Sequence, residues 1–160
     1  SPDHGTASGP APRPPGQTTF LLTAASLAAA AAFELYSVTA PVPLAGDLRG
    51  GAVAVAWHVL FAGVWAVLAY VFARRPAWGL RAIAVGTMVY AVDTLAFVLD
   101  DVARQAMIAE TVGGAEVLDL IDPSLPDQVA VAMRLGMLGC WVVLAGYTWV
   151  LRDSFGAGDG

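Results

Sequence analysis

The chain has 160 residues, of which 58% are hydrophobic and only 13% are charged, and its formal net charge is −5 at pH 7. Soluble domains carry about a quarter charged residues, so this composition excludes an ordinary soluble domain and predicts one integral membrane domain. It also offers no basic patch for nucleic acid, and the single cysteine excludes a disulfide framework within the chain. All eight basic residues are arginine and alanine is abundant, which favours a GC-rich organism and a prokaryotic inner or plasma membrane.

Residues 1–17 are rich in Pro, Gly and Ser and predict a disordered cytoplasmic tail rather than a signal peptide. Four apolar segments follow, each long enough to cross roughly 30 Å of hydrocarbon. They predict an all-α, integral membrane four-helix bundle of up-down-up-down topology. The expected domain covers residues 18–152 and is followed by a C-terminal tail, 153–160. Its spans are about 18–40, 51–73, 79–100 and 128–151, with an external loop at 101–127.

The arginines predict which way the helices cross the membrane. Arg74, Arg75 and Arg81 lie in or beside the second connection, and Arg13 and Arg152 flank the bundle on that same side. Only two arginines fall on the other side. Because cytoplasmic loops carry an excess of arginine and lysine, both termini are expected to be cytoplasmic.

The external loop 101–127 contains further helical patterns. Asp101–Thr111 keeps an apolar periodicity, so we expect the third helix to continue beyond the membrane as far as Gly113. Residues 115–121 are expected to form a short amphipathic turn. Ser124 followed by Asp127 resembles a capping box that opens the fourth helix.

Small and polar residues recur at three- and four-residue spacing on the helices and predict the faces that pack together. The stripe on the first helix includes Glu34, and the stripe on the third includes Asp93, so both carboxylates are expected to point into the bundle. On the fourth helix the expected interior face consists of Met133, Gly136, Met137 and Cys140, with Gly136, Gly139 and Cys140 making close helix contacts.

Each span carries one ionisable residue at about the same depth near the outer face: Glu34, His58, Asp93 and Arg134. Each lies six or seven residues inside the expected outer end of its helix, roughly 9–10 Å at the helical rise. A charge at that depth is costly and normally faces the bundle interior, where it is paired or functional. This layer is therefore the candidate site.

Three interpretations of the layer remain open. Arg134 requires Glu34 or Asp93 as its partner, and a buried network of this kind can simply fix helix order. Alternatively, Glu34, His58 and Asp93 form a one-histidine, two-carboxylate metal site. In the third interpretation, the same groups form a proton relay or a small-ligand pocket whose walls are Tyr36, Trp57 and Tyr90.

No catalytic motif is present, which leaves the enzyme class open and favours a non-catalytic or accessory subunit that contacts lipid and other membrane protein subunits. The alternative is an autonomous metal-, quinone- or lipid-binding site, or a proton half-channel, built on the charged layer with Tyr90. A bis-histidine haem within the chain is excluded, because His58 is the only histidine in a span and His4 lies in the tail.

Overall fold

The computed structural model describes residues 16–111 and 124–156. The described part of the chain is mostly helical, with one short β-hairpin. The predicted tail at 1–17 falls almost entirely outside this range, as do the predicted turn at 115–121 and residues 157–160.

Within residues 16–111 and 124–156, four helices are long and apolar enough to cross a membrane, which makes this a multi-pass membrane protein. Their bounds agree with the apolar segments to within about four residues at each end. They are α1 (Gln17–Tyr36), α2 (Gly51–Arg74), α3 (Gly79–Leu99) and α6 (Ser124–Val150). A short 3₁₀ turn, η1 (Arg152–Ser154), follows α6.

The expectation that the third helix continues past residue 100 is wrong. Asp100 leaves the helical conformation, with φ −97° and ψ 79°, and ends α3. A separate helix, α4 (Asp101–Thr111), begins directly afterwards. The amide of Ala103 donates to the Asp100 carboxylate at 3.1 Å, so Asp100 is the N-cap of α4. The periodicity of the segment predicted helix correctly, but the aspartate turns the chain.

The connection between α1 and α2 forms a β-hairpin. Strands β1 (Val42–Leu44) and β2 (Asp47–Arg49) pair antiparallel. The two turn residues, Ala45 and Gly46, both have positive φ, at 51° and 80°. That is the requirement of a type I′ turn, for which Asn-Gly is the usual signal and Ala-Gly a weak one.

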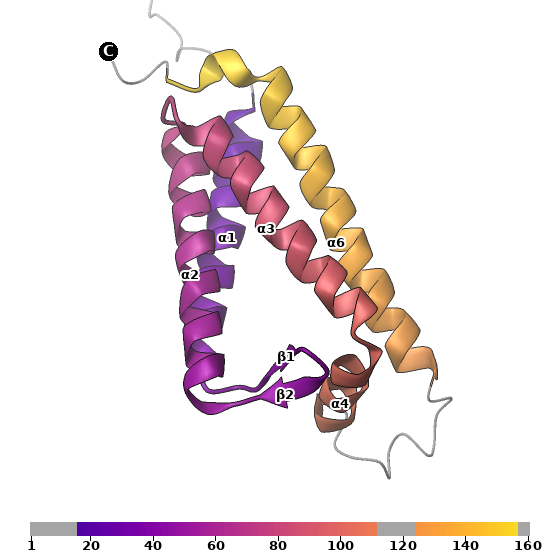
Figure 1. The fold of residues 1–160 in the computed structure, drawn as a ribbon. Coiled ribbons are helices and arrows are strands. Elements are labelled where there is room, and N and C mark those ends of the chain that lie inside the picture. The colour runs from indigo at the N-terminus through magenta and orange to yellow at the C-terminus, as the bar shows by residue number, and fades with distance from the viewer. Residues whose placement is uncertain (1–15, 112–123, 157–160) are drawn as a thin grey trace, which may run out of the picture.

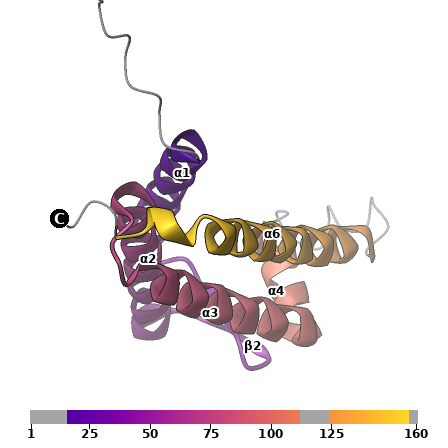
Figure 2. The ribbon, with the colours of Figure 1, turned by 90° about the horizontal axis from the view of Figure 1, so that it is seen from above.

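The long helices form two pairs. α1 packs mainly on α2, α6 packs on α3, and contacts between α2 and α3 join the pairs. The pairs lie close at one end and diverge toward the other, where the hairpin and α4 lie between them (Figure 1). Seen along the bundle, α3 and α6 run side by side away from α1 and α2 (Figure 2). We call the divergent end the hairpin end.

The apolar core lies nearer the opposite end. Phe20 of α1, Phe72 of α2 and Phe155 after α6 meet there, with ring centroids of Phe20 5.9 Å from Phe72 and 5.7 Å from Phe155. The amide of Gly156 donates to the carbonyl of Arg75 at 2.7 Å, which closes this end. Further along the bundle the core continues through a group of large aromatic side chains. The main apolar cluster therefore extends from this end as far as Phe61 and Tyr90, each one turn from a residue of the charged layer.

Candidate functional site

Glu34 and His58 form the first of two ion pairs in the charged layer. The hairpin returns the chain so that His58, two turns into α2, faces the last turn of α1. Its Nδ1 lies 2.6 Å from Oε2 of Glu34, and its Nε2 lies 3.0 Å from the carbonyl oxygen of Ala40. The imidazole is buried, while the Glu34 side chain is partly exposed. The pair thus ties α1 to α2 near the hairpin end.

The contacts of His58 determine how many protons the pair holds. A carbonyl oxygen only accepts, so Nε2 of His58 must carry a hydrogen and donate it to Ala40. The contact between Nδ1 and the Glu34 carboxylate then needs one more proton, shared between the two groups. Whichever atom holds it, the pair has no net charge. This neutrality greatly reduces the cost of placing it at bilayer depth.

Asp93 and Arg134 form the second ion pair. Nη1 of Arg134, on α6, donates to Oδ2 of Asp93, on α3, at 2.8 Å. The guanidinium also lies over the ring of Phe97, 4.9 Å from its centroid, within the range of a cation–π contact. This pair joins α3 to α6, as the first joins α1 to α2, and it is also neutral.

The four predicted site residues are therefore brought together as two pairs. Arg134, for which the sequence left two carboxylates open, pairs with Asp93, and His58 pairs with Glu34. In the part of the chain that the structure describes, no three His, Cys, Asp or Glu side chains gather in a way that could hold a metal ion. The geometry thus lends no support to Glu34, His58 and Asp93 as a common ligand set.

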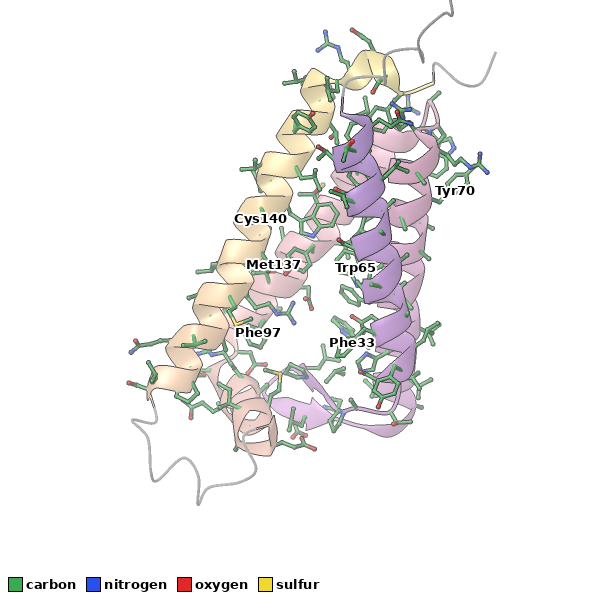
Figure 3. All side chains as sticks on the ribbon, turned by 180° about the vertical axis from the view of Figure 1, so that it is seen from behind. Phe33, Trp65, Tyr70, Phe97, Met137 and Cys140 are labelled. Carbon is green, nitrogen blue, oxygen red and sulfur yellow. The ribbon has the colours of Figure 1, made fainter. Side chains whose placement is uncertain are left out.

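Tyr90 lies deeper, away from the two ion pairs. It packs edge-on against Trp65, with ring centroids 5.7 Å apart, and also contacts Trp141. Trp65 and Trp141 stack with an interplanar angle of 13° and a centroid distance of 6.0 Å. Figure 3 shows Trp65 facing the space between α1 and α6, on the side where Met137 and Cys140 of α6 also lie. Tyr90 thus belongs to an aromatic cluster rather than to the charged layer.

Sequence reasoning missed the role of Arg104. Arg104 of α4 is buried, and its Nε donates to Asp127 of α6 at 2.5 Å. Its Nη1 donates to the carbonyls of Phe97 and Val98 at 3.0 and 2.8 Å. These carbonyls belong to the last turn of α3, which has no helical amides to satisfy them. One arginine therefore joins α3, α4 and α6. The sequence signal that could have identified this role is that Arg104 stands alone in an acidic segment.

Asp100 joins the hairpin to the junction of α3 and α4. The amide of Gly46, at the hairpin turn, donates to its Oδ2 at 2.6 Å. This bond and the one from Ala103 lower the pKa of the Asp100 carboxyl below its ordinary value, because both stabilise the charged form. The hairpin is thereby held against α4.

Thr94 is a second residue that sequence reasoning overlooked. Its side chain is completely buried, and its hydroxyl has no hydrogen-bond partner within the described residues. It lies one turn from Tyr90 on the same face of α3, and this spacing is the signal that could have identified it. An unsatisfied buried hydroxyl costs about 1–3 kcal/mol.

No protein family model, curated protein or solved structure matches this chain.

Proposed function

We propose that this protein is a non-catalytic subunit of a larger membrane assembly and that α6 is the helix that docks on a partner chain. The observation that carries this proposal is the exposure of α6. Only Trp141 and Thr148 of its 27 residues are buried, whereas α2 buries eight of 24. α6 is thus a membrane helix most of whose residues are exposed, and its exposed side is available to another transmembrane helix.

The exposed side of α6 has the residue types that allow close helix contact. A Cβ added at Gly136, Gly139 or Gly146 would meet nothing within 4 Å. The expectation that Gly136, Gly139 and Cys140 make close contacts inside the bundle is therefore wrong, and Met133 and Met137 are exposed as well. Small residues let helix backbones approach closely in lipid. We define the glycine face of α6 as the exposed residues Ala132, Gly136, Gly139, Val143, Gly146 and Val150.

The charged layer supports a non-catalytic role. Both ion pairs are neutral, and each ties two helices that are neighbours in the fold. Exchanging partners between helices would leave charged groups unpaired in the bilayer, which makes the layer suited to fixing helix order. On the arginine distribution, the layer and the hairpin end face outward and both termini face the cytoplasm.

Cross-linking in intact membranes of the source cells tests the proposal. A photoreactive amino acid is introduced at Val143, on the glycine face, and in a control protein at Val92 of α3. Both positions are exposed and apolar, at 73% and 68%. The proposal predicts a discrete cross-linked product from Val143 and none from Val92. It also predicts loss of that product when Gly139→Leu is added.

Three results would count against the proposal. Equal labelling at the two positions would mean that α6 faces only lipid. A Val143 product that survives Gly139→Leu would mean that the partner does not use the glycine face. A product containing only two copies of this chain would replace the accessory role with self-association.

A further inference from the structure

A groove between α1 and α6 has a volume of about 440 Å³ and reaches the aromatic cluster. Trp65, Tyr90 and Trp141 form its deep side, each less than 10% exposed. Residues of α1 and α6 form its walls, and the rim carries three hydroxyls and one thiol. The rim residues are Thr19, Thr23, Ser26 and Cys140. The groove is thus apolar overall but contains polar groups at defined positions.

The deep side carries three hydrogen-bonding groups, the indoles of Trp65 and Trp141 and the phenol of Tyr90. Neither indole N–H of Trp65 and Trp141, nor the phenol of Tyr90, makes a hydrogen bond within the part of the chain that the structure describes. Buried tryptophan and tyrosine normally find such partners. These three polar atoms are not fully enclosed by protein, since Oγ1 of Thr94 is the only enclosed side-chain polar atom without a partner among the described residues. In a bilayer no bulk water supplies the missing partners. An occupant that accepts hydrogen bonds would satisfy them.

The chemistry of these groups restricts the occupant. An indole N–H only donates, and a phenol donates readily, so the occupant must offer acceptor oxygens. No charged side chain lines the groove, which argues for a neutral molecule. The flat rings of Trp65 and Trp141 suit a planar ring, and the opening toward lipid suits an apolar tail. We infer that this groove binds a neutral, lipid-soluble quinone-type ring through its carbonyl oxygens.

A second groove in the same molecule gives an internal comparison. It lies between α2 and α3, is larger at about 650 Å³, and is lined mainly by aliphatic residues such as Val59, Leu60 and Val67. Trp78 and Arg81 also line it, so it too has hydrogen-bond donors, although Trp78 is 48% exposed. The two grooves differ in their linings: the first has neutral donors only, whereas the second has mainly aliphatic walls and a charged guanidinium. Gly63 lies in the second groove, and a side chain added there meets nothing within 4 Å.

Binding can be measured on the full chain in lipid nanodiscs through its own tryptophans. Decylubiquinone is titrated, and quenching of tryptophan fluorescence is followed. The inference predicts saturable quenching that weakens roughly three- to tenfold in Tyr90→Phe, the loss expected for one neutral hydrogen bond. Ala30→Phe, which fills the groove from α1, should abolish the saturable component. Gly63→Leu, which fills the second groove, should bind as the wild type does.

Decylbenzene provides the matched ligand control, because it has the ring and the tail but no carbonyl oxygen. It should fail to compete with decylubiquinone. Purely linear quenching, equal competition by decylbenzene, or unchanged binding in Ala30→Phe would each overturn the inference. Loss of binding in Gly63→Leu alone would assign the ligand to the other groove and overturn it as well. Gel filtration and circular dichroism of each variant establish that it is folded.

Discussion

α2 and α6 have similar lengths and apolar compositions, but the protein holds them in different ways. α2 lies against both α1 and α3 and buries eight residues, including Phe61, Leu68 and Phe72. α6 packs mainly on α3 and is joined to other helices by two ion pairs, Arg134 with Asp93 and Asp127 with Arg104. One helix is fixed by packing against two neighbours, whereas the other packs mainly on one helix and is also joined by two ion pairs near one end.

This difference teaches that apolar character predicts a membrane span without predicting its neighbours. In lipid, an exposed apolar side chain carries no penalty, so α6 can remain exposed and still be stable. The glycines show the contrast most directly. Gly86 of α3 is closely packed against Leu68, whereas Gly139 of α6 has open space beside it.

The largest effect is expected from removing the charge that holds α6. Arg134→Met leaves the Asp93 carboxylate without its partner in an apolar setting, which should lower the free energy of unfolding by about 2.5–3.5 kcal/mol. The double variant Asp93→Leu/Arg134→Met should recover most of that loss. Unfolding by sodium dodecyl sulfate in mixed micelles measures both. A single variant as stable as the double would show that α6 is not held by this ion pair.

A smaller effect is expected from crowding the packed glycine. A Cβ at Gly86 would lie 2.7 Å from Cδ1 of Leu68, so Gly86→Leu should destabilise the chain by about 1–3 kcal/mol. Gly139→Leu should leave the stability of the isolated chain unchanged or slightly raised, because nothing lies near it. Thermal unfolding of the purified Gly86→Leu and Gly139→Leu variants measures both effects. Equal destabilisation would contradict the distinction between the two helices.

The ion pair between α1 and α2 is expected to matter less, because packing along α2 also holds these helices together. Glu34→Ala leaves the buried imidazole of His58 without its side-chain partner and should cost about 1–2 kcal/mol. In Glu34→Gln, the amide can donate to Nδ1 while Nε2 still donates to Ala40, so the cost should stay below about 1 kcal/mol. Unfolding by sodium dodecyl sulfate measures the loss of stability in the Glu34→Ala and Glu34→Gln variants. Equal losses in the two variants would mean that a hydrogen bond at Nδ1 does not suffice and that a charge is required.

The smallest effect is expected at the hairpin. The folded pKa of Asp100 is lowered, so its contribution is present at neutral pH and lost as the pH falls through that folded value, below 3.8. Hydrogen exchange of the Gly46 amide should therefore lose protection in strong acid. Asn offers one acceptor oxygen instead of two, so Asp100→Asn should lose part of that protection at neutral pH. Protection of Gly46 that is independent of both pH and this substitution would contradict the assignment.

The sequence predicted the four helices well, because long apolar runs have a strong signal. It also identified Glu34, His58, Asp93 and Arg134 as the residues of the candidate site. It did not determine the pairing, because Arg134 had two carboxylates at similar depth and only the tertiary fold separates them. The partner choice is a property of which helices lie side by side.

Other features had weaker signals. The break at Asp100 was hidden because residues on both sides of it favour helix, and the hairpin was hidden by an Ala-Gly turn. The direction in which the glycines of α6 point was predicted incorrectly. Periodicity identifies a face, but in a membrane it does not tell whether that face meets a helix of the same chain or something else.

Native mass spectrometry of the protein extracted with its surrounding membrane tests the central claim, that α6 docks on a partner chain, most directly. The account predicts a wild-type particle that contains this chain and a different membrane polypeptide. It predicts that Gly139→Leu, which leaves the chain itself folded, releases the partner and gives the mass of one chain alone. A wild-type particle with the mass of a single chain would contradict the account.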